Sequence, residues 1–429
     1  METSNPDLTV HRLGECRIPS PMSRVQFVKD EERVLYHSSL NELEVLLETG
    51  KRVPAFELAG PRKDIFFDPS KLKCGIVTCG GICPGVNDVI RAITLSLFHH
   101  YGVCTVFGFR YGYEGLSPMY RHTPLELTPE LVADIHQKGG TILGSSRGPQ
   151  DVSQMVDTLD RMNVRILFAI GGDGTLRGAQ ALSEEIERRD MKIGVIGIPK
   201  TIDNDISYVD KSFGFDTAVA ESRTAIYSAH VEATGARNGI GLVKLMGRHS
   251  GFIAAHAALA NNDANFCLVP EAPFTLEAFL DALRERIVQR HHAVVVVAEG
   301  AGQKLMGKNL KRDSSGNIRL GDIGLFLRDR IRDYFRDIGT EVTLKYIDPS
   351  YTIRSMPANP NDSVFCLLLG QYAIHAGMAG RSNLVVGYWN GEFTHVPIAL
   401  AVSKRRQIDP QGSLWSSVLE ATGQPRDMS

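Results

Sequence analysis

The sequence predicts an α/β fold with two doubly wound (Rossmann-like) domains and mainly parallel sheets. Short apolar runs that end in glycine alternate with helical stretches, which is typical of parallel strands joined by covering helices. The chain has 429 residues, more than one hydrophobic core usually organises, so we expect two domains of roughly 150–200 residues. An apolar content of 43% and a charged content of 22% are those of a soluble globular protein.

The first alternating stretch begins at residue 72. Residues 74–78 form a buried apolar run that ends at Gly80-Gly81, and a helix is expected to begin after Pro84-Gly85, where apolar residues recur at helical spacing. Further strands are expected at 103–108, 165–170 and 193–198, with a helix carrying Leu176, Ala179, Leu182 and Ile186 after the third strand.

The same alternation continues in the second half of the chain. Strands are expected at 240–246, 266–269, 293–297 and 384–388, and helices at 251–260, 276–289 and about 364–379. By contrast, residues 1–70 are polar and contain proline, so we expect an extension that lies over a neighbouring domain or subunit, with Val45-Leu46-Leu47 as an apolar anchor. Residues 403–429 are expected to form a C-terminal tail.

Composition and the chain ends exclude several classes of partner. A net charge of −2 gives no electrostatic basis for binding nucleic acid or a membrane surface. No apolar run reaches the roughly 18–20 residues of a membrane span, and the first residues lack a signal-peptide pattern, so a cytoplasmic location is expected. Seven scattered cysteines, without a second pair at zinc-like spacing near Cys79 and Cys83, indicate reduced thiols.

The glycine-rich segment Gly171–Gly178 directly follows a buried strand. Glycines let a phosphate approach bare backbone N–H groups, and the carboxylate of Asp173 can hold Mg²⁺ on a polyphosphate. A purely structural turn is the alternative, but three glycines around one aspartate favour phosphate contact. The segment alone leaves the acceptor of the phosphoryl group open.

Three other strand ends carry suggestive residues, and ligands of parallel sheets bind at this edge. Gly80-Gly81 forms a turn onto a helix N-terminus, and Arg147 lies in a loop of small residues; alone, each could be structural. The third end is more specific, because Asp203 and Asp205 follow a strand two residues apart. Phosphoryl transfer needs one acid for the metal and one for the acceptor's proton, together with cations such as Lys200.

Seven segments in unbroken order give the chain a resemblance to the 6-phosphofructokinases over about residues 72–400. They are Cys79-Gly-Gly-Ile-Cys-Pro-Gly85, Gly139-Gly-Thr-Ile-Leu-Gly-Ser-Ser-Arg147, Gly171-Gly-Asp-Gly-Thr175, Pro199-Lys-Thr-Ile-Asp-Asn-Asp205, Met246-Gly-Arg-His-Ser-Gly251, Ala298-Glu-Gly300 and Tyr351-Thr-Ile-Arg354. Gly-Gly-Asp-Gly-Thr alone also occurs in NAD kinases and lipid kinases, which lack the other segments.

The resemblance implies a role for each matching residue. Asp203 is implied as the general base for the sugar's 1-hydroxyl, with Arg248 and Lys200 near the transferred phosphoryl group and Asp173 and Asp205 as Mg²⁺ residues. The implied donor site comprises Gly80, Arg147, Gly172, Gly174, Thr175 and Gly178. The implied fructose 6-phosphate site comprises Thr201, Asp203, Met246, Gly247, Arg248, Glu299, Lys345, Tyr351 and Arg354. Lys345 and Tyr351 stand where the bacterial pattern has arginine and histidine.

Two positions bear on the phosphoryl donor and disagree. Lys200 matches the pyrophosphate-dependent enzymes, whereas Gly174 replaces their second aspartate. A carboxylate at 174 would repel the α-phosphate of ATP, so glycine favours ATP as the donor. The mixed pair resembles the ATP-dependent enzymes of plants and trypanosomatids, whose long N-terminal extension is also similar to residues 1–70.

The resemblance implies an ATP- and Mg²⁺-dependent 6-phosphofructokinase that is a homotetramer, with its active site in a cleft between domains. The expected donor domain is 71–212 plus 358–402, and the expected fructose 6-phosphate domain is 213–357. Two alternatives remain at this point. One is the same reaction with pyrophosphate as donor, and the other is a non-catalytic regulatory subunit that senses sugar phosphate or nucleotide.

Overall fold

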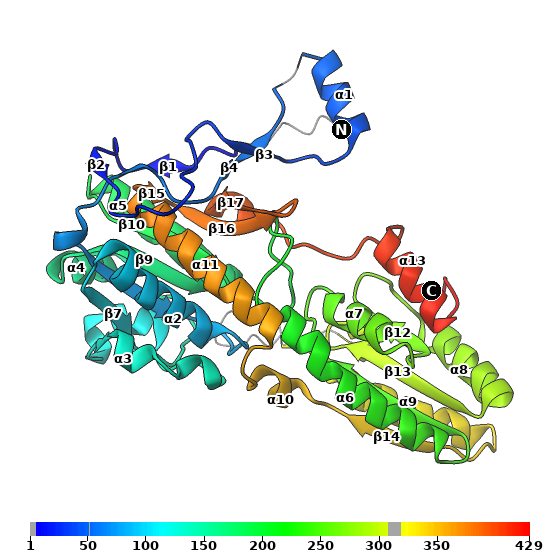
Figure 1. Cartoon of the computed structure of the whole chain (residues 1–429). Helices are drawn as coiled ribbons and strands as arrows, with labels where there is room; N and C mark the ends of the chain where they lie inside the picture. Colours follow the sequence, from blue (N-terminus) through cyan, green and yellow to red (C-terminus); the bar gives the residue numbers. More distant parts are fainter. Residues whose placement is uncertain (1–5, 51, 308–318) are drawn as a thin grey trace. The chain divides into compact units, whose positions relative to one another are not determined.

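The chain forms two compact units in the structure, a computed structural model that describes residues 6–50, 52–307 and 319–429 (Figure 1). Unit 1 comprises Met1–Thr201, Ile206–Gly214 and Met356–Lys404. Unit 2 comprises Ile202–Asp205, Phe215–Ser355 and Arg405–Ser429, so most of the expected C-terminal tail belongs to it. Across the described ranges, no helix is long and apolar enough to cross a membrane.

Unit 1 is built on a nine-stranded sheet whose five central strands are parallel. In sheet order the strands are β3 (Arg33–Leu35), β4 (Ala55–Leu58), β17 (Glu392–Pro397), β16 (Leu384–Trp389), β10 (Gly194–Pro199), β9 (Val164–Gly171), β6 (Lys73–Thr78), β7 (Thr105–Phe109) and β8 (Leu125–Glu126). The outer strands β17, β4, β3 and β8 pair antiparallel. The expected parallel α/β architecture is confirmed, with antiparallel edges added.

Helices cover both faces of this sheet. The longer helices α2 (Val86–Ser96) and α11 (Pro360–Met378) pack together on one face, and α4 (Val152–Arg161), α5 (Asp173–Arg188) and α12 (Ile398–Ala401) cover the other. Gly85 caps α2 with a φ of 97°, and a Cβ there would lie 2.6 Å from the Cys366 sulfur, so only glycine fits this strand-to-helix turn. Among the described residues, the other α-helices of unit 1 are α1 (Leu40–Glu48) and α3 (Pro129–Val132).

A buried cluster of charges fixes the N-terminal extension to unit 1. The Glu57 carboxylate on β4 accepts hydrogen bonds from Arg381 Nε at 2.9 Å and Arg62 Nη2 at 3.3 Å, and it lies 3.2 Å from His395 Nδ1 on β17. Arg381 also donates to Asp30 at 2.7 Å. One short ribbon adds to this attachment, β1 (His11–Arg12) with β15 (Arg381–Ser382), and a second, β2 (Ile18–Pro19) with β5 (Asp64–Ile65), joins two segments within the extension.

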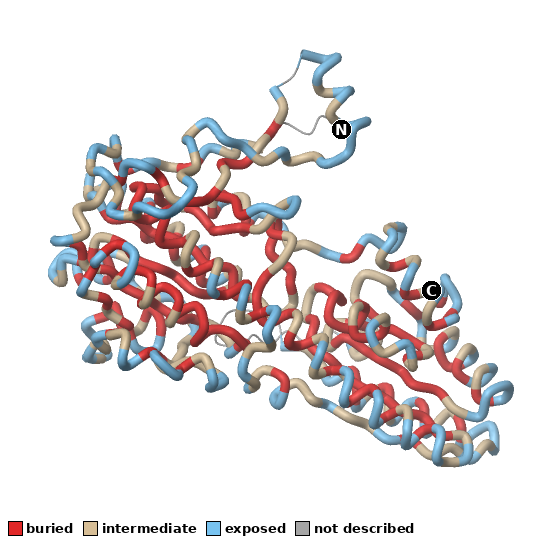
Figure 2. The backbone as a smooth tube through the Cα atoms, viewed as in Figure 1, coloured by how far each residue is buried: buried red, intermediate tan, exposed pale blue. Residues whose placement is uncertain are grey.

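The apolar anchor that we expected in the extension is not buried within the chain. Val45 and Leu47 are 60% and 66% exposed, and α1, which carries them, has no buried residue (Figure 2). The extension is instead held by this charge cluster together with apolar residues outside α1, such as Phe56 and Ile65, which are fully buried.

Unit 2 is a smaller version of the same layered design. Its four parallel strands are, in order, β12 (Phe266–Leu268), β13 (His292–Ala298), β11 (Gly239–Leu245) and β14 (Thr343–Ile347). One face is covered by α6 (Phe215–Thr234), α7 (Phe252–Asn261) and α13 (Ser413–Thr422), and the other by α8 (Leu276–Arg290) and α9 (Ile323–Asp337). A short helix, α10 (Ser350–Arg354), follows β14.

Candidate functional site

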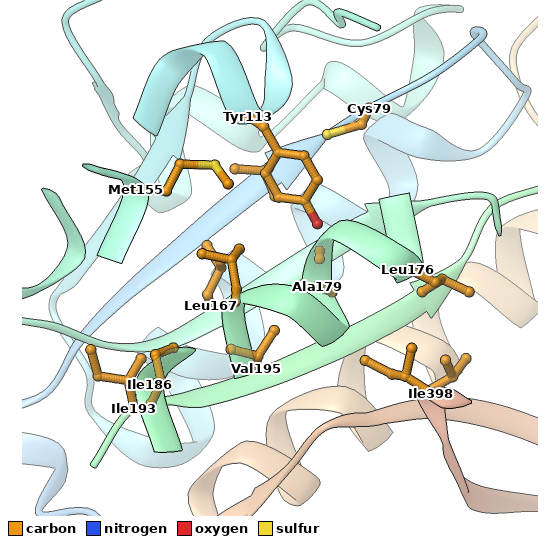
Figure 3. Close-up of a cluster of buried hydrophobic side chains, with 14 of the residues drawn as sticks. Cys79, Tyr113, Met155, Leu167, Leu176, Ala179, Ile186, Ile193, Val195 and Ile398 are labelled. Carbon is orange, nitrogen blue, oxygen red and sulfur yellow. The ribbon is translucent and has the colours of Figure 1, made fainter. Parts of the chain in front are cut away.

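The turn from β9 into α5 places the glycine-rich segment at a helix N-terminus. Gly172 is the N-cap residue and Asp173 begins the helix, so the N-terminus of α5 lies directly at the end of β9, the position at which anion-binding turns offer backbone N–H groups. The core supports this turn, because the Tyr113 hydroxyl donates to the Thr175 carbonyl at 2.7 Å. Figure 3 shows the Tyr113 ring above α5, and a Cβ on Gly178 would lie 2.6 Å from that ring.

Three loops of unit 1 meet beside this turn. Gly80 donates its N–H to the Ser146 carbonyl at 3.1 Å, and the Ser145 hydroxyl donates to the Gly80 carbonyl at 2.6 Å. Lys200, at the end of β10, donates its backbone N–H to the Gly171 carbonyl at 2.9 Å and its ammonium to the Gly81 carbonyl at 2.6 Å. The predicted donor residues therefore lie on loops that hydrogen-bond to one another, with Arg147 exposed next to Ser146.

Asp173 and Gly174 sit at the accessible start of α5. The Asp173 side chain is 27% exposed and lies 3.5 Å from the Arg177 guanidinium. Gly174 is exposed, and a Cβ built on it meets no atom within 4 Å. A side chain at position 174 would thus project into open space without a steric clash, so a substitution there can be made without disturbing the fold.

In unit 2, a loop between β11 and α7 surrounds Asp203. Arg248 donates its backbone N–H to the Asp203 carboxylate at 3.3 Å, and the Ser250 hydroxyl donates to the Asp203 carbonyl at 3.3 Å. Gly247 has a φ of 127°, and a Cβ there would lie 2.5 Å from the Ser250 carbonyl oxygen, so this tight loop requires glycine. Met246, just before it, is buried.

Burial and two neighbouring carboxylates together outweigh the groups that lower the pKa of Asp203. Burial, Asp205 and Glu299 raise the pKa of Asp203 to about 7, against the lowering effects of the Arg248 N–H and the Arg405 charge. Burial also raises the pKa of Glu299, although Arg248, Lys244 and Arg354 oppose that shift. Raised carboxyl pKa values are common where a carboxylate must accept a proton near neutral pH.

Asp205 is buried and has a partner that the sequence did not single out. The Arg405 guanidinium donates to Asp205 Oδ2 at 2.7 Å, although 200 residues separate them along the chain. In the sequence, Arg405 stands out only as part of the basic run Lys404–Arg406, which lies in the expected C-terminal tail.

The remaining residues predicted to bind the sugar phosphate differ in how closely they are associated with Asp203 and Glu299. The charge of Arg354, on α10, opposes the rise in the pKa of Glu299, so Arg354 lies within electrostatic range of that carboxyl group. By contrast, Lys345 is exposed and pairs with Glu232 of α6 at 3.7 Å, and Tyr351 is 81% exposed. Thr201 belongs to unit 1, where its carbonyl accepts a hydrogen bond from the Ser212 hydroxyl at 2.6 Å.

A family model described as Phosphofructokinase matches residues 73–377. The chain belongs to this family. The resemblance inferred from the seven motifs is thereby confirmed, and the matched region spans segments of both units.

Relatives of similar length support the same assignment. An ATP-dependent 6-phosphofructokinase of Borreliella burgdorferi is 46% identical over 447 residues, covering 100% of this chain and 99% of the relative. One from Trypanosoma cruzi is 46% identical over 429 residues, covering 98% and 88%. A pyrophosphate-dependent phosphofructokinase structure from Marinobacter aquaeolei, at 18% identity, covers 83% of this chain and 93% of its own with a TM-score of 0.68, which shows the shared fold.

Proposed function

We propose that this chain is an ATP-dependent 6-phosphofructokinase of glycolysis. It transfers the γ-phosphoryl group of ATP to the 1-hydroxyl of fructose 6-phosphate, giving ADP and fructose 1,6-bisphosphate. The observation that carries the proposal is its 46% identity to an enzyme of that name across the whole length of both chains. The open, exposed position of Gly174 at the start of α5 supports ATP as the donor, because it leaves room for an additional phosphate.

The residues of the chain divide the work between binding and proton transfer. The backbone N–H groups at the start of α5 and the loops at Gly80 and Arg147 bind the phosphates of the donor. Arg248, Glu299 and Arg354 orient the sugar phosphate. Asp203 accepts the proton of the 1-hydroxyl as the bond to phosphorus forms, since its raised pKa suits a base at neutral pH. Lys200 and Arg248 offset the negative charge of the group in transfer.

Mg²⁺ is part of the proposal, with Asp173 and Asp205 as the residues that would hold it. Throughout the described ranges, no group of three or more His, Cys, Asp or Glu side chains is placed to hold a metal ion. This fits a Mg²⁺ that arrives with the nucleotide, because such ions use one or two carboxylates and take their other ligands from phosphates and water. Bound there, Mg²⁺ would neutralise charge on the phosphate oxygens.

The test is to assay the purified chain with fructose 6-phosphate and Mg²⁺, using first ATP and then pyrophosphate. Turnover with ATP and little with pyrophosphate is the expected result. Turnover with pyrophosphate alone would overturn the donor assignment. Silence with both donors, together with measurable sugar-phosphate binding, would instead favour the non-catalytic regulatory subunit.

Replacing Gly174 probes the donor directly. Gly174→Asp should lower kcat/KM for ATP on the order of 10-fold to 1,000-fold, because its charge would face the α-phosphate at close range, and should affect pyrophosphate far less. Because a Cβ at 174 meets no atom within 4 Å, a side chain there fits the folded chain. Gly174→Ala is the uncharged control, and it is expected to retain ATP turnover. Equal losses with both donors would contradict the charge argument.

The assembly is proposed as a homotetramer, by analogy with the family. Light scattering during gel filtration measures its mass. A monomeric active enzyme would contradict this part of the proposal without affecting the assigned reaction.

A further inference from the structure

Four successive residues, Arg405–Ile408, contact both catalytic loops of unit 2; we call them the C-terminal strap. Arg405 donates to Asp205 Oδ2 at 2.7 Å, and the backbone N–H of Arg406 donates to the Asp205 carbonyl at 2.9 Å. Asp205 is thus held by its side chain and its backbone from one stretch of chain. Its side chain is only 5% exposed.

The other end of the strap reaches the loop that holds Asp203. Gln407 donates its side-chain amide to the His249 carbonyl at 2.9 Å. Ile408 donates its N–H to Glu271 Oε1 at 3.0 Å, and the same Glu271 oxygen accepts the Gly251 N–H at 3.0 Å. Glu271 therefore bridges the strap to the N-cap residue of α7.

The strap is itself firmly attached to unit 2. Ile408 is buried in the core, and α13, which follows it, buries Trp415 and Val418. Beyond α13, the Gln424 side chain accepts the Cys267 N–H of β12 at 2.6 Å and donates to the Cys267 carbonyl at 3.3 Å. Because these contacts fix the C-terminal strap to the core of unit 2, the strap can in turn hold Asp205 and the 247–251 loop in place.

The loop that carries the two aspartates needs such support. Asn204, between them, has a φ of 55°, a left-handed conformation that asparagine adopts more readily than most residues but that still makes a sharp turn of the backbone. The orientation of each carboxylate depends on this turn, and proton transfer depends steeply on the position of the base. The Arg405 bond to Asp205 and the Arg248 bond to Asp203 fix the two sides of the turn.

We infer that Arg405 is a positioning residue for phosphoryl transfer, acting through Asp205 to fix the Asp203–Asp205 turn. The inference rests on the proposed function. A partner that orients a functional carboxylate without contacting substrate typically contributes about 10- to 100-fold to activity. Its loss lowers turnover while leaving substrate binding largely intact.

The test compares Arg405→Gln, Arg405→Lys and the exposed control Arg426→Gln in the full chain. Arg405→Gln should lower kcat about 10- to 100-fold with KM for ATP and fructose 6-phosphate close to wild type. Arg405→Lys should recover most of kcat, because one charged N–H donor suffices for the bond to Oδ2. Arg426→Gln should match the wild type in every measurement.

Direct measurements separate positioning from stability and from binding. Calorimetric titration with fructose 6-phosphate should give similar affinities for wild type and Arg405→Gln, and thermal unfolding shows whether the variant is folded. If it is not, Arg405→Met, which keeps the aliphatic stem, replaces it.

Three results would overturn the inference. They are an unchanged kcat in Arg405→Gln, a raised KM with unchanged kcat, and a lysine variant no better than the glutamine variant. Inactivity of the wild type with both donors would overturn the proposed function, and this inference with it.

Discussion

Two buried carboxylates in this chain, Glu57 and Asp203, have opposite surroundings. Glu57 lies among Arg62, Arg381 and His395; burial alone would raise its pKa, but the hydrogen bonds and charges of His395 and Arg381 outweigh burial and hold the pKa well below 4.5. Asp203 lies near Asp205 and Glu299, and its pKa rises to about 7.

The difference separates a carboxylate that holds structure from one that is available for chemistry. A buried charge surrounded by cations stays ionised and ties segments together. A carboxylate beside other carboxylates gains a greater affinity for protons, at some cost in folding free energy. The three predictions below test this contrast.

Replacing Asp203, the carboxylate with like-charged neighbours, should have the largest effect, and this effect should be on catalysis. Asp203→Ser should lower kcat by about 10²- to 10⁴-fold, because the general base is lost, while fructose 6-phosphate affinity changes little. The free energy of unfolding should stay within about 1 kcal/mol of wild type, since the change removes a charge that other carboxylates oppose. Steady-state kinetics and urea unfolding measure both quantities. Near-normal kcat would refute the role of Asp203 as base.

Replacing Glu57, the carboxylate that lies between arginines, should instead affect stability. Glu57→Gln should lower the free energy of unfolding by about 3–5 kcal/mol, because Arg62 and Arg381 remain buried without their shared counter-charge. Glu15→Gln is a matched control, because Glu15 pairs with Arg17 at the surface with 74% of its side chain exposed, and it should cost no more than about 1 kcal/mol. Equal effects of the two variants in urea unfolding would show that the cluster does not hold the extension.

The pH dependence of stability should give the smallest effect. Since the folded pKa of Glu57 is below its unfolded value of about 4.3, its contribution is present above that pH and declines as the pH falls further. The stability gap between wild type and Glu57→Gln should therefore narrow below pH 4, by up to about 1.4 kcal/mol per pH unit. Urea unfolding at pH 7, 5, 4 and 3 measures the gap. A gap that widens on acidification would contradict the assigned direction of the shift.

The central strands were predictable because each is a short, largely buried apolar run. Residues 74–78 and 193–198 became β6 at Lys73–Thr78 and β10 at Gly194–Pro199. The antiparallel edge was not predictable. Buried Thr394 and His395 make β17 look polar, and the partner of His395 is Glu57, far away in the sequence.

The site was predictable to the extent that its residues are adjacent in sequence. Gly171–Gly178 and Pro199–Asp205 carry their geometry in short motifs at strand ends. Arg405 could not be found in that way, since its contact with Asp205 depends on the tertiary path of the chain. Lys345 and Tyr351 were assigned from alignment alone, and their place in the sugar-phosphate site stays a prediction.

The pairing of β4 with β17 has a consequence for synthesis on the ribosome. β4 enters the sheet beside β17, and Glu57 meets its partners Arg381 and His395 only after the chain has been made almost to its end. Until then the early segment has β3 and Arg62 as partners of β4 and Glu57, but it lacks the strand β17 and the charge of Arg381. Contacts between such distant segments form late and slow folding, so a nascent chain of this protein exposes its first strands longest and is most open to chaperones and proteases there.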